Sequence, residues 1–201
     1  MTLCKNRQSR LVIFTNIGRI MHTSAKKLAL MAILAAIALI IFIIEAQIPL
    51  PIPIPGVRLG LANAVTLFAL FYNKCKTCQK NRPPDRLSLT TLDAFAILLC
   101  RILLGAVFMG RPIVLAYSLA GGLLGFAAQA VSSRVVSARQ IWVCGAIGAI
   151  FHNVGQILAA IVITGTPAIA MYLPMLIIAG VFTGVLTGLI AQFSLSRLQN
   201  R

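Results

Sequence analysis

The stretch from Ile141 to Ile163, IWVCGAIGAIFHNVGQILAAIVI, decides the fold class. It belongs to an uncharged run of 57 residues that extends from Gln140 to Ser196. A bilayer core of about 30 Å needs roughly 20 apolar residues per helix, so this run is long enough to cross a membrane twice. The cluster Thr164-Gly165-Thr166-Pro167 divides the run, because Gly and Pro interrupt helices. The sequence therefore predicts two membrane-spanning helices, at 141–163 and 172–193.

Apolar runs of similar character precede this stretch. They predict four more spans, at 27–44, 57–72, 87–109 and 112–131. Hydrophobic residues make up 59% of the 201 residues and charged residues only 10%, whereas a soluble domain carries about 25% charged residues. We therefore expect an all-α integral membrane protein with six transmembrane helices.

The basic residues predict the orientation of these helices. The chain has 18 Lys and Arg against 3 Asp and Glu, and 15 of the 18 fall on one side of the six-helix topology. Because short cytoplasmic loops retain Lys and Arg, both termini are expected in the cytoplasm. Residues 1–25 are a basic cytoplasmic extension that could be disordered, and Met21 is an alternative start to Met1. Residues 26–198 form the membrane domain, with a basic cytoplasmic loop at 74–86. The bases lie between apolar runs and not on one soluble face, which argues against a nucleic-acid partner.

The sequence lacks the residues that common catalytic sites require. Its acids, Glu45, Asp85 and Asp93, are not clustered as a magnesium diphosphate site requires. The chain contains neither a phosphate-binding P-loop motif nor a G-x-S-x-G nucleophile motif. Cys75 and Cys78 form a C-x-x-C pair, but a structural zinc site needs four ligands; either a metal or redox role or a pair of reduced thiols fits them. We expect no enzyme activity, no cofactor and no metal.

Glu45 and the residues that follow it mark the end of the first span. The segment from Ile48 to Gly56 has proline at every second position between Pro49 and Pro55, which favours an extended conformation without internal hydrogen bonds. Such a segment is tolerated at membrane depth only where protein covers it or water lines it. It is either a lid over a cavity or a loop in the headgroup region.

Arg101 lies near the middle of the third predicted span, too far from either end for easy snorkelling. An intramembrane charge is expected to face the bundle interior and find a partner. Asp93 is two helical turns away and out of reach, so Glu45 is the expected partner. The alternatives are a structural ion pair and a contact with an anionic substrate, whose oxygens suit a guanidinium.

The fifth predicted span carries His152, Asn153 and Gln156 in an otherwise apolar helix. Spacings of three and four predict that all three side chains share one face. They serve either a substrate or proton pathway or hydrogen bonding between helices. Arg58 and Asn63, near the start of the second span, complete the list of candidate polar residues.

Four motifs in order resemble one bacterial family. They are Val57-Arg58-Leu59-Gly60-Leu61-Ala62-Asn63, Arg101-Ile102-Leu103-Leu104-Gly105, Ser118-Leu119-Ala120-Gly121-Gly122 and His152-Asn153-Val154-Gly155-Gln156. These motifs look like the Gx transporter family, also filed as heptaprenyl diphosphate synthase component I, over about residues 26–198. The basic loop at 74–86 looks longer than the connection usual in that family.

The resemblance implies an architecture similar to the substrate-capture S components of energy-coupling factor transporters. In these six-helix proteins the first loop closes over a substrate, and an alanine motif on the first helix docks a coupling subunit that bears two ATPases. Ala32 and Ala36 match that alanine motif, and the proline-rich segment matches the first loop. The family's location implies a multi-pass protein of the bacterial cytoplasmic (inner) membrane.

Two functions follow from these observations. The first is a substrate-binding or transport protein, with a small anionic or amphipathic substrate held by Glu45, Arg58, Asn63, Arg101, His152, Asn153 and Gln156. The second is a non-catalytic membrane subunit of heptaprenyl diphosphate synthase in menaquinone side-chain synthesis, which would partner a soluble synthase subunit.

Overall fold

The computed structural model describes residues 25–47, 58, 60–77, 89–110, 112–137 and 140–199 of the chain. The predicted N-terminal extension, the proline-rich segment, most of the basic loop, and Cys78 and Arg111 lie outside the described residues. The described part is helical, with an N-terminal helix at Ala25–Ala46. The helices that follow are α2 (Asn63–Thr77), α3 (Thr91–Met109), α4 (Pro112–Val135), α5 (Ile141–Thr164) and α6 (Leu173–Gln199), with a short 3-10 helix at Pro167–Tyr172 before α6.

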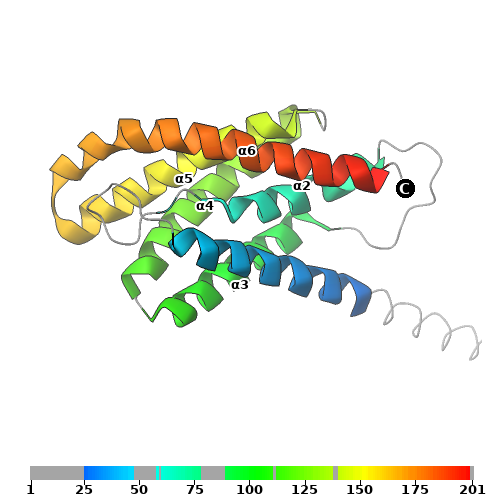
Figure 1. Cartoon of the computed structure of the whole chain (residues 1–201), viewed down its shortest axis with the longest axis horizontal. Coiled ribbons are helices and arrows are strands. Elements are labelled where there is room, and N and C mark those ends of the chain that lie inside the picture. The colour runs from blue at the N-terminus through cyan, green and yellow to red at the C-terminus, as the bar shows by residue number, and fades with distance from the viewer. Residues whose placement is uncertain are drawn as a thin grey trace, which may run out of the picture.

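The helices form one elongated bundle in which α5 lies between α4 and α6 (Figure 1). Glycines allow these helices to approach closely. A Cβ atom on Gly184 of α6 would lie 2.6 Å from the Gly145 carbonyl oxygen of α5, and one on Gly125 of α4 would lie 2.9 Å from the Gly148 carbonyl oxygen. Backbone-to-backbone packing of this kind holds helices together where lipid removes the hydrophobic driving force.

The N-terminal helix packs on the other side of the bundle, against α2 and α3. Its buried residues Leu34, Ala35 and Ala38 share a core with residues of these two helices, such as Val65 and Ile97. Lys27 also forms an ion pair with Asp93 at the start of α3, with 2.6 Å between Nζ and Oδ2. Ala32 and Ala36, by contrast, lie on the exposed face of the N-terminal helix.

Helix length confirms most of the predicted spans. Within the described residues, five helices are long and apolar enough to cross a membrane. The helix α2 is the exception, since its apolar part covers only Asn63–Tyr72, about 15 Å at 1.5 Å per residue against a core of about 30 Å. The start of the first helix and the end of α6 lie at the same end of the bundle (Figure 1).

The second predicted span therefore differs from the structure at both of its ends. Arg58 and residues 60–62 are not helical, and α2 continues to Thr77, past the predicted start of the basic loop at Lys74. Gly60 has a φ of +81°, in the left-handed region that favours glycine. Non-helical chain at membrane depth needs protein around it, and Arg58, Gly60 and Ala62 are buried.

Candidate functional site: a buried polar cluster

The Glu45 carboxylate fixes the turn that leads into α2. It is only 4% exposed. Its Oε1 accepts a hydrogen bond from the Gly60 backbone N–H at 2.5 Å, and its Oε2 accepts one from the Leu61 N–H at 3.1 Å. Backbone donors to a carboxylate offset part of the cost of burying it. Glu45 thereby joins the end of the N-terminal helix to the residues before α2.

Arg58 lies beside this turn and is held at three points. Its backbone N–H donates to Gln156 Oε1 at 3.0 Å, and its Nη1 donates to the Phe42 carbonyl oxygen at 3.0 Å. The guanidinium carbon lies 3.9 Å from the centre of the Phe42 ring, within cation–π distance. A guanidinium keeps its proton in proteins, so Arg58 brings a positive charge to the cluster, close to the negative charge of Glu45.

Arg101 lies midway along α3 and is 2% exposed. Its Nη2 donates a long hydrogen bond of 3.5 Å to Asn63 Oδ1, and its guanidinium carbon lies 5.7 Å from the Phe42 ring centre. The Lys27–Asp93 contact is the one ion pair among residues whose positions the structure gives. Glu45, the predicted partner of Arg101, makes no direct ion-pair contact with it, because both carboxylate oxygens bond to the backbone N–H groups of Gly60 and Leu61, but its charge lies near enough to attract the guanidinium.

His152 and Gln156 of α5 are the remaining polar side chains of the cluster. Gln156 Oε1 already accepts from Arg58, so the amide nitrogen faces His152 Nε2 at 2.9 Å and must donate to it. This assigns the ring proton of His152 to Nδ1. Nδ1 lies near the Gly121 carbonyl without a hydrogen bond of normal geometry. Glycine at position 121 leaves the space that the Gln156 side chain occupies, because a Cβ atom there would lie 2.8 Å from Gln156 Cγ.

Asn153 does not belong to this cluster. Its Nδ2 donates to the Leu176 carbonyl oxygen of α6 at 2.7 Å, and Gly180 of α6 leaves the space that its amide fills. The prediction that Asn153 shares one face with His152 and Gln156 is wrong, because one residue along a helix turns the side chain by about 100°. Asn153 joins α5 to α6.

The cluster contains two residues that the sequence did not single out. The Phe42 ring lies near the guanidinium groups of both Arg58 and Arg101. Phe42 precedes Glu45 by three residues, so Phe42 and Glu45 lie on the same face of the N-terminal helix. That spacing is the sequence signal that could have identified Phe42. Gly60 supplies the backbone donor to Glu45. Thr66 connects the cluster to a further buried polar residue. Its Oγ1 bonds to the Asn63 carbonyl oxygen and lies 3.5 Å from Gln129 Oε1 of α4.

The cluster has more positive than negative charge, and two of its hydrogen-bond donors lack acceptors. It holds two guanidinium groups, those of Arg58 and Arg101, and one carboxylate, that of Glu45. Arg101 Nε and Asn63 Nδ2 are buried donors with no hydrogen-bond partner. Within the described residues no group of three His, Cys, Asp or Glu side chains is placed to hold a metal. The arrangement can accept the oxygens of an anion, since guanidinium and amide donors suit carboxylate and phosphate.

The chain matches the family model described as heptaprenyl diphosphate synthase component I, over residues 34–80 and 86–194. The two matched segments are separated by residues 81–85, inside the basic loop. No curated protein and no protein of solved structure matches the chain. The match covers well over half of the residues, including every residue of the polar cluster, and the chain belongs to the heptaprenyl diphosphate synthase component I family.

Proposed function

We propose that this membrane protein binds a small anionic solute at the polar cluster of Glu45, Arg58, Asn63, Arg101, His152 and Gln156. The observation that carries the proposal is the pair of unpartnered donors, Arg101 Nε and Asn63 Nδ2, on two side chains that contact each other inside the bundle. An unpaired polar group costs free energy when it is buried. An anion that accepts from both groups removes that cost and neutralises the excess guanidinium.

The role proposed for this binding is solute capture for transport across the bacterial cytoplasmic membrane. Support comes from the chain that leads into the cluster. Gln156 accepts a hydrogen bond from the Arg58 N–H, and Glu45 accepts hydrogen bonds from the Gly60 and Leu61 N–H groups, so the backbone before α2 is fixed beside the proposed anion. The exposed alanines Ala32 and Ala36 are available to dock a coupling subunit with its ATPases.

The experiment identifies what the protein carries. We would purify the full chain in mild detergent, denature it, and identify the released small molecules by mass spectrometry. A stoichiometric water-soluble anion is expected from the wild type, and Arg101→Gln and Asn63→Ala should each lose it. Arg134→Gln is the matched control, because Arg134 is an exposed arginine in the last turn of α4. Equal anion content in Arg101→Gln and wild type, with both proteins monodisperse, would contradict the proposal.

A second candidate function rests on the description of the family. The protein would then be a non-catalytic membrane subunit that partners a soluble prenyl diphosphate synthase. Its two described acids are each engaged within the chain, Glu45 with backbone N–H groups and Asp93 with Lys27. Co-purification of a soluble synthase that depends on this chain, with no released water-soluble anion, would favour this function over solute capture.

A further inference from the structure

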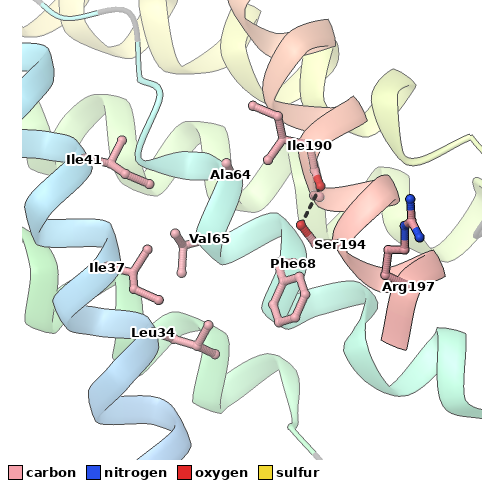
Figure 2. A pocket seen from close by; sticks show the side chains of 10 residues that line it. Leu34, Ile37, Ile41, Ala64, Val65, Phe68, Ile190, Ser194 and Arg197 are labelled. Atoms are coloured by element: carbon pink, nitrogen blue, oxygen red, sulfur yellow. Dashed lines mark hydrogen bonds between the residues drawn. The ribbon is translucent and has the colours of Figure 1, made fainter. Parts of the chain in front are cut away.

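An apolar groove of about 760 Å³ lies between the N-terminal helix, α2 and α6, away from the polar cluster (Figure 2). Its walls are aliphatic and aromatic side chains, with Leu34, Ile37 and Ile41 from the N-terminal helix and Val65 and Phe68 from α2. The groove shares no lining residue with the polar cluster. It opens to the side of the bundle, since Ile37 and Ile190 on its two rims are 43% and 54% exposed.

Among the described residues that line the groove, Arg197 alone is charged. It lies in the last turn of α6, at the end of the groove to the right in Figure 2. Its guanidinium forms no ion pair or hydrogen bond with any residue that the structure describes. Ser194, its neighbour on the wall, already donates its hydroxyl proton to the Ile190 carbonyl oxygen at 2.8 Å. Arg197 is therefore the group available to bind an anion at this end.

The groove and Arg197 together select for one kind of molecule, an apolar chain with an anionic head. In a bilayer the space beside exposed isoleucines is occupied by lipid tails. Arg197 lies at the end of the bundle where the N-terminal helix begins with Lys26 and Lys27 (Figure 1). Anionic headgroups are attracted to basic residues at such a membrane surface. A transmembrane helix of another protein would fill the walls but would leave the guanidinium without an anion.

We propose that this groove is a binding site for an anionic glycerophospholipid, with one acyl chain along the N-terminal helix and α6 and the phosphate at Arg197. The proposal does not rest on the anion site at the polar cluster. The lipid bridges the N-terminal helix and α6, which are connected there through α2.

The test is native mass spectrometry of the full chain in detergent, titrated with phosphatidylglycerol and, separately, with phosphatidylcholine of the same acyl chains. Phosphatidylglycerol should be retained about fivefold better, and Arg197→Gln should remove that preference. Arg197→Lys should keep most of it. Arg134→Gln is the matched control and should keep all of it, because Arg134 is also an exposed last-turn arginine but does not line the groove.

A second pair of variants tests the walls. Ala64→Trp fills the groove and should lower the binding of both lipids, whereas Ile178→Trp, on the exposed face of α6 outside the groove, should lower neither. Glycerol phosphate without acyl chains should not compete, which distinguishes a lipid from a free phosphate. Equal retention of the two lipids by wild type, or equal loss of the preference in Arg197→Gln and Arg134→Gln, would overturn the proposal. So would a bound protein that excludes both lipids.

Discussion

At the scale of single residues, Phe42 organises the charges of the polar cluster. Its ring is 2% exposed and lies against the guanidinium groups of Arg58 and Arg101, at 3.9 Å and 5.7 Å from ring centre to guanidinium carbon. The negative face of an aromatic ring attracts a cation, more strongly where water is excluded. The ring thus offsets part of the repulsion between two arginines that share one carboxylate.

Gly105 of α3 provides the space for this ring, which leads to the first prediction. A Cβ on Gly105 would lie 2.5 Å from Phe42 Cε1, and the ring is fixed by Arg58. Gly105→Ala should therefore destabilise the protein by about 1–3 kcal/mol, the usual cost of overpacking. Thermal unfolding in detergent, followed by the fluorescence of the single tryptophan Trp142, measures the change. In a Phe42→Leu background the same substitution should cost less, and an unchanged cost would show that the ring is not the obstacle.

The two amides of α5 lead to the second prediction, because they bond in different directions. Gln156 orients His152 and the Arg58 backbone, whereas Asn153 bonds only to α6. Gln156→Leu should abolish anion binding, because it removes the contacts of Arg58 and His152. Asn153→Leu should leave anion binding intact and lower stability by about 1 kcal/mol or more, since the Leu176 carbonyl loses its side-chain donor. Isothermal titration with the released anion and thermal unfolding separate the two effects. Loss of anion binding in Asn153→Leu would contradict the exclusion of Asn153 from the anion site.

At this scale the sequence identified the buried polar residues but not the contacts that each of them makes. Polar residues within apolar spans are expected to be buried inside the bundle. The structure buries all six of those in the cluster, which are Glu45, Arg58, Asn63, Arg101, His152 and Gln156. The direction of each side chain depends on backbone that the residue pattern does not specify. Arg101 is the example, since its expected carboxylate is occupied by the N–H groups of a non-helical turn.

At the scale of elements, the lengths of the apolar runs predicted the long helices but not the turn before α2. Five spans, those of the N-terminal helix, α3, α4, α5 and α6, begin and end within a few residues of the prediction, except that α6 extends to Gln199. The second span was predicted from hydropathy alone. The hydropathy of this stretch does not distinguish it from a helix, but Gln156 accepts from the Arg58 N–H and Glu45 accepts from the Gly60 and Leu61 N–H groups, which keeps these residues out of a helix.

The third prediction concerns the contact between α5 and α6. Gly184→Val would place a Cβ 2.6 Å from the Gly145 carbonyl oxygen and 2.8 Å from Ala149 Cβ. Because helix backbones cannot yield as a flexible side chain does, the helices must separate, at a cost of about 3 kcal/mol. Ala32→Leu is a suitable control, since it adds a larger side chain on an exposed face and should leave thermal unfolding unchanged. Equal unfolding temperatures for Gly184→Val and wild type would contradict close packing at this position.

At the scale of the whole molecule, the chain begins its first helix and ends α6 at the same end of the bundle (Figure 1). This arrangement agrees with an even number of crossings. The helix α2 is too short to cross a membrane by itself, so a sixth crossing would need the buried, non-helical residues before it as well. The basic residues Lys26, Arg134 and Arg197 belong to helix ends that the charge pattern assigns to the cytoplasm.

The fourth prediction tests this topology. A fluorescent protein fused after Arg201 should fluoresce in intact bacteria, and alkaline phosphatase fused at the same place should be inactive, because the C-terminus is expected in the cytoplasm. The same pair of reporters fused between Gly110 and Pro112 should give the opposite pattern. An active phosphatase at the C-terminus would reverse the orientation inferred from the 18 basic residues.

The anchoring of Gly60 and Leu61 by Glu45 has a consequence for how this protein can diverge. The contact closes the intervening chain into a ring whose base is fixed, independently of what the ring contains. Closing a flexible ring costs little more when it is longer, about 0.6 kcal/mol for each doubling of length. A change in the number of residues between Glu45 and Gly60 therefore adds little to the cost of closing this ring, and the contact at its base depends only on the carboxylate and two backbone N–H groups.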